Sequence, residues 1–243
     1  MISQKIPLTN ASGIGPLPIL LEGMAGGKPL ERVFRKSNLP LAVIEHPQQE
    51  ILMTQMVKLF ENASREAGDR LFGLRVGLEM DPAAYGKWTR YASEADHLED
   101  AIRRLGRTFS LHQNMGYMAL ETKREISVWT YVHPTMVSER GKNHADHILP
   151  TMIRIGRSFL GPRWSPEWVR MFYEKDASET AITDLIGTEV RYNGKGVSVA
   201  FKHGDLHRKK RVNAPAPLTS TEVMAEDFSQ NNRGGLSQIE AIV

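Results

Sequence analysis

Cysteine does not occur among the 243 residues of this chain. Its absence excludes disulfide bonds, thiolate metal sites and cysteine nucleophiles, and it is typical of proteins from a reducing compartment such as the cytoplasm. Long apolar runs are also missing, because no window approaches the roughly 18 uninterrupted apolar residues of a transmembrane helix. We therefore predict a cytoplasmic protein without a membrane partner.

An excess of charge of one sign is likewise lacking. The 31 lysines and arginines are nearly balanced by 28 aspartates and glutamates, which leaves a formal net charge of +3. This charge is too small for a general nucleic-acid-binding surface. The densest basic run, "HRKKR" at residues 207–211, adjoins a segment rich in proline and asparagine and is typical of a solvated hinge.

Motifs of the common enzyme classes are missing as well. The chain has no nucleophile elbow, P-loop, dinucleotide fingerprint or His-Glu metalloprotease motif. His144 and His147 lie three positions apart with Asp146 between them, but without a third ligand at a telling distance the pattern favours solvated helix histidines over a metal site. We predict no metal, no cofactor and no catalytic activity. A small-molecule enzyme stays open as an alternative, because a closed pocket can look the same in sequence.

Apolar residues follow a helical spacing in three segments. The first is residues 47–67, with a proline in its first turn and Gly68 where a helix would stop. The second begins after Ser93, where "SEAD" is typical of a helix start. The third lies within 139–161, where we expect Pro150 to kink the helix or to mark its start.

Strand patterns occupy the remainder of the second half. Residues 117–121 and 125–132 are rich in β-formers and are joined by a polar turn, which predicts a hairpin. Residues 168–175 form a short strand candidate, and 189–201 reads as two strands around an Asn-Gly turn. Together the segments predict an α+β fold in which amphipathic helices pack on a mainly antiparallel β-sheet.

Two tryptophans, Trp164 and Trp168, lie between the last predicted long helix and the strands that follow. Pro162 and Pro166 bracket them and prevent the helix from continuing. Large aromatic side chains at such a corner supply apolar area that fixes it. The pattern therefore favours a structural joint over a ligand contact.

The candidate ligand-binding residues are aromatic and basic. Trp88, Trp129 and Tyr131 flank the change from helical to strand patterning, and small ligands usually bind in mostly apolar cavities with a few polar anchors. Packing in the core is the alternative for each of the three. Arg75 and Arg90 lie nearby in sequence, and guanidinium groups pair well with carboxylates and phosphates, which favours an anionic effector.

A second ligand signature involves the stretch "NASGIG" at residues 10–15. It resembles the Asn-x-Ser-x-x-Gly half of the cyclic-di-GMP signature of PilZ domains. Arg103 and Arg107 supply an arginine pair, but in PilZ domains that pair comes first, in a flexible segment, whereas here it follows and is helical. A cyclic-di-GMP receptor is therefore kept as an alternative.

Three stretches, taken in order, carry a resemblance to a known family. They are "AGDRLFGLRVG" at 67–77, the "HLEDAIRRLGRTFSL" segment at 97–111, and the block from "RWSPEWVRM" to "HGDL" at 163–206. Over about residues 14–208 the chain resembles the effector-binding, dimerising N-terminal domain of AraC/XylS-type transcriptional regulators, in the arabinose-binding-like branch.

This resemblance implies an organisation and a set of partners. It implies an effector-binding and dimerisation domain at 1–211, a linker at 212–235, and the start of a truncated helix-turn-helix DNA-binding domain at 236–243. A small-molecule effector and a second copy of the chain would be the partners, and DNA would be bound only through the missing C-terminal domain. We expect the dimer interface on the amphipathic helix within 138–160, unless the core uses its whole apolar stripe.

Overall fold

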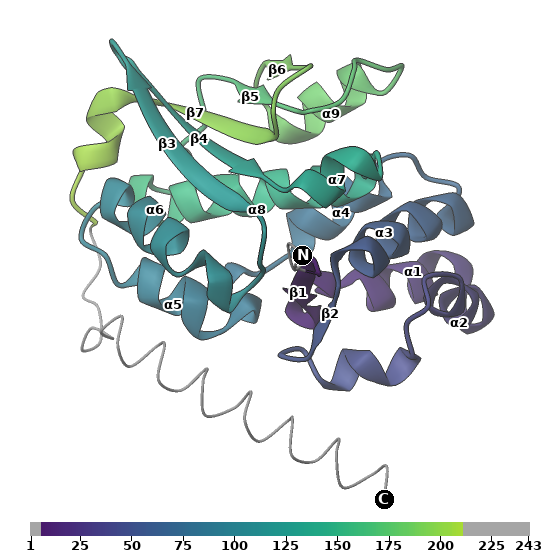
Figure 1. Cartoon of the computed structure of the whole chain (residues 1–243). Helices are drawn as coiled ribbons and strands as arrows, with labels where there is room; N and C mark the ends of the chain where they lie inside the picture. The colour runs from purple at the N-terminus through teal and green to yellow at the C-terminus, as the bar shows by residue number, and fades with distance from the viewer. Residues whose placement is uncertain (1–5, 211–243) are drawn as a thin grey trace, which may run out of the picture.

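The computed structural model describes residues 6–210, and Figure 1 shows their arrangement. The predicted linker at 212–235 and the predicted helix start at 236–243 lie outside the described residues. The described helices are α1 (Leu17–Ala25), α2 (Gly27–Lys36), α3 (Met53–Ala67), α4 (Phe72–Glu79), α5 (Lys87–Ser93), α6 (Leu98–Arg107), α7 (Pro134–Ser138), α8 (Lys142–Leu160) and α9 (Glu179–Ile186). The short 3₁₀ helices are η1 (Ala11–Ile14), η2 (Leu41–Glu45), η3 (Pro82–Tyr85), η4 (Phe109–Leu111) and η5 (His203–His207).

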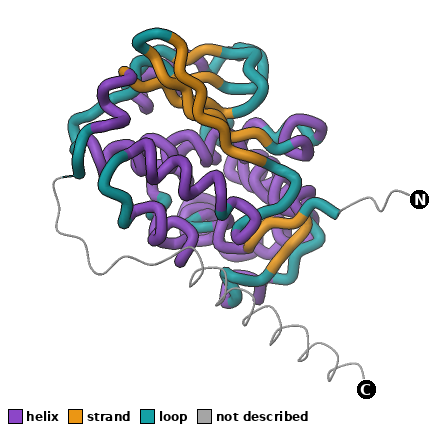
Figure 2. Tube along the Cα trace, turned by 60° about the vertical axis from the view of Figure 1, so that its left-hand side comes forward, coloured by secondary structure: helices purple, strands orange, loops and turns teal. Residues whose placement is uncertain are grey.

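The strands form one larger and one smaller sheet. They are β1 (Leu8–Asn10), β2 (Glu50–Leu52), β3 (Tyr117–Lys123), β4 (Ile126–Val132), β5 (Val169–Arg170), β6 (Val190–Arg191) and β7 (Val197–Lys202). β1 pairs with β2, and the larger sheet has the order β3-β4-β7-β5-β6, antiparallel except between β5 and β6. The larger sheet lies on one side of the helices, away from the β1–β2 pair (Figure 2). The predicted α+β class is confirmed.

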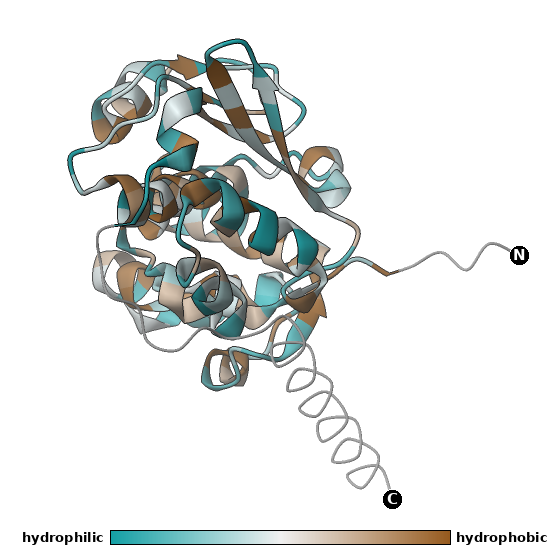
Figure 3. Ribbon diagram, turned by 90° about the vertical axis from the view of Figure 1, so that its left-hand side faces the viewer, coloured by the Kyte–Doolittle hydropathy of each residue, from teal (hydrophilic) through white to brown (hydrophobic). Residues whose placement is uncertain are grey.

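The hairpin of β3 and β4 forms as the sequence predicted. Leu120 pairs with Trp129 in its register, and Arg124 adopts a left-handed φ of 55° in the turn. Alternate β4 residues, among them Trp129 and Tyr131, are buried. Apolar and more polar bands correspondingly alternate along the hairpin in Figure 3. One face of β4 therefore points into the core.

The second predicted hairpin, around Asn193, is wrong. β5 lies between β6 and β7 in the sheet, and Val169 of β5 pairs with both Val190 and Val199. Instead of closing a turn between β6 and β7, the N–H of Asn193 donates to the carbonyl of Tyr173 at 3.0 Å. Contacts with a distant segment thus override the local turn preference.

Two helix starts also differ from the prediction. Helix α3 begins at Met53 because the preceding residues pair with β1, although it ends before Gly68, whose φ of 63° suits glycine. Ser93 ends α5 and does not start the next helix, since α6 begins at Leu98. His97 is held in extended conformation by a bridge to Lys209, and this separates the two helices.

Helix α8 passes through the middle of the molecule (Figure 1), in contact with α3, α4 and β7. His144 and His147 are only 4% and 2% exposed, so the prediction that they are solvated is wrong. Pro150 lies inside the helix and is buried, so it does not mark the helix start. Of the apolar stripe of α8, Ala145, Met152 and Phe159 are buried in the core, whereas Ile148 and Ile155 are only partly buried. Dimerisation through this helix stays a prediction.

Helices α4 and α8 meet backbone to backbone. A β-carbon built on Gly73 would lie 2.1 Å from the carbonyl oxygen of Asn143, and one on Gly77 would lie 2.3 Å from that of His147. The amide N–H of Gly73 donates to Asn143 Oδ1 at 3.1 Å. Only glycine, which has no β-carbon, permits this approach.

The two tryptophans after α8 occupy a corner of the fold. Trp164 stacks on Phe201 of β7, with ring centroids 5.0 Å apart and an interplanar angle of 12°, and its Nε1–H donates to Asp205 at 3.3 Å. The guanidinium groups of Arg170 and Arg191 lie over the ring of Trp168. These contacts join the end of α8 to the sheet, which is the structural role that the flanking prolines indicated.

Gly77→Ala should lower the free energy of unfolding by about 1–3 kcal/mol, the usual cost of adding atoms to a packed contact. Gly23→Ala in α1 is the matched control, because a β-carbon there meets nothing within 4 Å. Alanine's higher helix propensity should then stabilise the chain by up to about 1 kcal/mol. Urea unfolding of both variants measures the difference. Equal shifts in the two variants would contradict the close helix contact.

Candidate functional site

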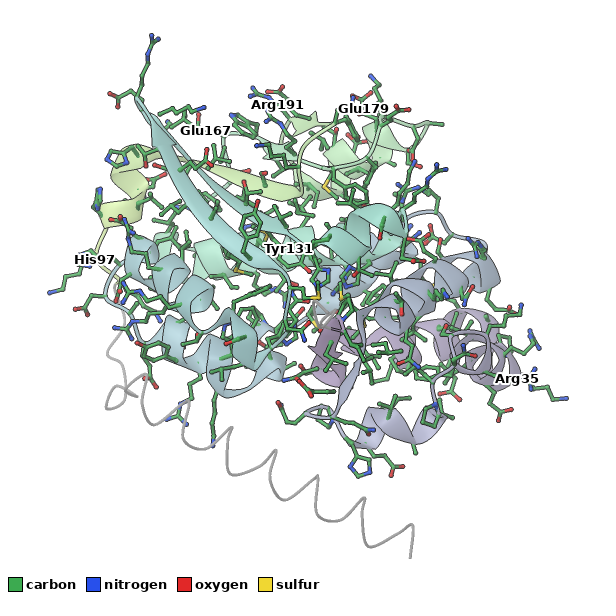
Figure 4. All side chains as sticks on the ribbon, in the orientation of Figure 1. Arg35, His97, Tyr131, Glu167, Glu179 and Arg191 are labelled. Carbon is green, nitrogen blue, oxygen red and sulfur yellow. The ribbon has the colours of Figure 1, made fainter. Side chains whose placement is uncertain are left out.

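A cavity of about 50 Å³ lies under β4, among the helices. Its walls come from β4, α5, α8 and the loop after η4, with Met56 of α3 on one side. A single water needs roughly 10–15 Å³ of such space, so the cavity has room for several waters or a small molecule. Figure 4 labels Tyr131, which lies in the interior near the end of the hairpin, whereas the labelled Arg191 and Glu179 lie at the periphery.

The three aromatic residues predicted for the site line this cavity together. The Nε1–H of Trp88 donates to the carbonyl of Leu105 at 3.1 Å, and the hydroxyl of Tyr131 is within 3.3 Å of both side-chain polar atoms of Gln113. Trp129 is fully buried on β4. The hairpin and α5 thus place these rings around one cavity, while their contact with a ligand stays a prediction.

Three histidines at the cavity were not among the predicted site residues. His112 stacks on Trp88, with ring centroids 4.8 Å apart, and His147 stacks on Phe60 at 4.2 Å. The ring centroids of His144 and His147 are 4.9 Å apart, and the two residues lie one turn apart on α8. The spacing of the two α8 histidines was visible in sequence, but their burial depends on α4, whose approach no local pattern reveals.

The three imidazoles are held in their neutral forms. Removal from water penalises the imidazolium ion, and it lowers the pKa of His112 to about 3 and that of His147 to about 4. The same desolvation, with the nearby His147, lowers the pKa of His144 well below its ordinary value. At neutral pH each ring can therefore donate one hydrogen bond and accept another.

Four buried ring nitrogens at this cavity have no hydrogen-bond partner in the described part of the chain. They are Nδ1 of His112, Nε1 of Trp129, Nδ1 of His144 and Nε2 of His147. The Nδ1 of His147 lies 2.6 Å from the carbonyl of His144, so Nδ1 carries the proton and Nε2 is left as an acceptor. The indole N–H of Trp129 is a donor only. Buried polar atoms are normally paired, so this concentration of unpaired atoms is a feature that needs a partner.

Comparison with known proteins identifies the family. Residues 27–209 match the family described as "Arabinose-binding domain of AraC transcription regulator, N-term", which covers more than half of the chain. The chain belongs to this family. The resemblance read from its sequence is thereby confirmed, although the matched range begins at residue 27 rather than near 14. The family is a regulatory, effector-binding one.

A solved structure also has a similar fold. The crystal structure of transcriptional regulator CdpR from Pseudomonas aeruginosa aligns with a TM-score of 0.53 and 15% sequence identity, over 76% of this chain and 56% of that one. At this identity the likeness shows the fold alone, and the chain spans little more than half of that regulator. No curated protein matches the chain.

The two predicted arginines do not join the aromatic cluster of this arabinose-binding-type domain. Arg75 is half exposed and pairs with Asp69 at 2.7 Å, and Arg90 of α5 pairs at 3.2 Å with Glu94, the residue that caps the end of that helix. Arg90 lines a separate groove beside the cavity. Among the described residues that line the cavity, none is a lysine or arginine. The placement of guanidinium groups beside Trp129 and Tyr131 was therefore wrong, because each is occupied by a nearby carboxylate.

The cyclic-di-GMP signature does not form an open site. Asn10 and Ser12 are buried, and the side-chain amide of Asn10 donates to the carbonyl of Leu111 at 3.0 Å. Arg103 is exposed and pairs with Glu99 on its own helix. The segment therefore holds β1 and η1 against the loop after η4, which is a structural role.

Residues 6–210 contain no group of three or more histidine, aspartate or glutamate side chains placed to hold a metal ion. The pair His144 and His147 lacks a third such ligand within that range. None of the helices in the same range combines the length and the apolar character needed to cross a bilayer.

The histidine pKa values predict that the domain loses stability in mild acid. In the unfolded chain an imidazole takes up a proton near pH 6.5, but in the folded chain His147 does so only near pH 4 and His112 only near pH 3. Between these values the unfolded chain binds more protons. Each such histidine therefore lowers the free energy of unfolding by up to about 1.4 kcal/mol for each pH unit of acidification. Asp146, whose pKa burial raises to about 6, opposes this between about pH 6 and 4.

His112→Gln should make this loss of stability less steep, since it removes one buried imidazole and leaves an uncharged side chain. Urea unfolding at pH values from 7 to 4.5 gives the slope of the unfolding free energy against pH. His46→Gln is the control, because His46 is exposed. Identical slopes for His112→Gln and the unmodified chain would contradict a neutral, buried His112.

Proposed function

We propose that this domain senses a small, uncharged polar molecule in the cavity under β4. The observation that carries the proposal is the set of four unpaired ring nitrogens on neutral, buried side chains. An unpaired polar atom in the interior costs about 1–3 kcal/mol. A ligand that pairs with several of these atoms recovers that free energy, and this makes the cavity selective for polar groups.

The charge of the ligand follows from the charge of the wall. An anion entering this cavity would lose its hydration without meeting a cation among the described residues, because the lining imidazoles are neutral and the lining within residues 6–210 includes no arginine or lysine. A hydroxyl group both donates and accepts a hydrogen bond. It would match the acceptor Nε2 of His147 and the donor Nε1 of Trp129. We therefore favour a hydroxylated or amide-bearing neutral molecule over the anionic effector that the sequence suggested.

A route for the signal leads from the cavity through the sheet. Trp129 pairs with Val199 of β7, and β7 runs directly into η5 and on to Lys210. A ligand that binds one arrangement of β4 better than another shifts the population toward that arrangement. In a regulator of this family, such a shift would reach the segments that follow the domain, and a dimer and DNA would be its downstream partners.

Matched ligand pairs test the proposal. Glycerol, erythritol and arabinose should each raise the melting temperature of the chain more than glycerate, erythronate and arabinonate do, because stabilisation follows RT ln(1 + [L]/Kd). Trp129→Phe removes the indole donor and keeps an aromatic ring, and it should weaken the neutral ligand by about two- to tenfold. The Arg75→Ala, Arg90→Ala double variant is the control and should bind as the unmodified chain does.

Preferential binding of the carboxylates, lost in the double arginine variant, would overturn the proposal. Mass spectrometry of small molecules retained by the purified chain provides an independent readout of ligand identity. Chemical conversion of a bound ligand during that experiment would favour the enzyme alternative.

A further inference from the structure

A groove of about 580 Å³ adjoins the cavity, between η3, α5 and the C-terminal part of α8. Its floor is apolar, with Ala92 and Leu105 on one side and Ile155 and Phe159 on the other. Phe159 is buried and Ile155 is partly exposed. The groove is large enough for an extended apolar chain, and its walls resemble the apolar lining of small-molecule sites.

The charged side chains that line the groove are those of Asp81, Lys87, Arg90 and Arg154, and each has an interaction within the chain. Arg90 pairs with Glu94, and a guanidinium N–H of Arg154 donates to the carbonyl of Leu78. The carboxylate of Asp81 accepts from the amide of Ala83 at 2.9 Å. Arg90, Arg154 and Asp81 therefore offer no ready partner for an anionic group at the rim. The apolar floor remains the main contact surface.

The cavity and the groove share two side chains. Thr89 and Ile155 line both of them. The hydroxyl of Thr89 is fixed by hydrogen bonds to the carbonyls of Pro82 and Gly86, at 2.6 and 3.2 Å. The side chain of Ile155 carries no polar atom, so a rotamer change there breaks no side-chain hydrogen bond and is the less costly way to join the two spaces.

One face of α8 runs continuously from the cavity to the groove. Ile148, Met152 and Ile155 line the cavity, and Ile155 and Phe159 line the groove. Residues at these spacings of three and four lie above one another along a helix. A molecule extended along this stripe would reach the unpaired nitrogens at one end and the apolar groove at the other.

We infer that the effector site has two compartments and takes an amphipathic molecule, with an uncharged polar head in the cavity and a short apolar tail that passes Ile155 into the groove. This inference rests on the proposed function, because the head group is the polar ligand proposed above. It adds the class of ligand, which a cavity of about 50 Å³ alone would limit to very small molecules.

A homologous series of primary amides tests the inference, since each member has the same neutral head. Dissociation constants for acetamide, butanamide, hexanamide and octanamide are measured on the full chain from the indole N–H resonance of Trp129 in ¹⁵N-labelled protein. A methylene moved from water to an apolar wall raises affinity by about fourfold. We expect octanamide to bind at least tenfold more tightly than acetamide.

Variants of the passage and of the groove separate the two compartments. Ile155→Trp fills the passage, and Ser158→Trp fills the groove from an exposed rim position and leaves the core intact. Each should abolish the gain with chain length. Ser158→Trp, which lies outside the cavity lining, should also leave acetamide binding unchanged. Ile155→Val and Leu185→Trp, a substitution at an exposed site on α9, are the controls and should keep the gain.

The outcomes distinguish the inference from the proposed function. Equal affinities for acetamide and octanamide, or a gain that survives both Ile155→Trp and Ser158→Trp, would overturn the two-compartment site and leave the polar cavity as proposed. Failure of every amide to shift the Trp129 resonance would overturn both. A gain that disappears in both variants while acetamide still binds would support the inference.

Discussion

The contact between α4 and α8 is the constraint on which the remaining architecture depends. Because Gly73 and Gly77 carry no β-carbon, α8 can lie against the α4 backbone and pass through the interior instead of covering it from outside. This position buries His144 and His147 on one side and supports the sheet on the other. The neutral state of the histidines follows from that burial. Two glycines thus determine the chemistry of a cavity that they do not line.

The cavity concentrates polar atoms that the fold leaves unpaired. Most buried polar groups in proteins are satisfied, and each exception reduces the stability of the folded chain. Here Trp129 and two α8 histidines contribute such atoms within one small space. The proposed ligand would pair with these atoms, whereas the neighbouring side chains of Tyr131 and Trp88 already have hydrogen bonds inside the protein.

The parts of the fold that were predictable are those governed by local patterns. The hairpin of β3 and β4 and the α+β class followed from strand and helix periodicity, and the family followed from the order of several short stretches.

The pairing of β6 was not predictable, because a two-residue strand from a separate segment, β5, competes for its edge. The histidines were misjudged for the same reason, since their burial is decided by a helix some 70 residues earlier in the chain. Large rings at a helix-to-strand change are recognisable in sequence, and the three that were named line one cavity, whereas the partners of Arg75 and Arg90 depend on side-chain geometry.

Lys210, the last described residue, is attached beside the groove by hydrogen bonds and a cation–π contact. Its backbone N–H donates to the carbonyl of Asp96 at 2.8 Å, its ammonium group donates to the carbonyl of Ser93 at 2.5 Å, and that ammonium lies 4.8 Å from the ring centroid of Phe159. Ser93 and Phe159 also line the groove. Whatever occupies the groove therefore shares two residues with this attachment, and thermodynamic linkage makes the coupling reciprocal. If an occupant weakens the attachment of Lys210 by some factor, then the attachment of Lys210 weakens the binding of the occupant by the same factor, and detachment of Lys210 strengthens that binding.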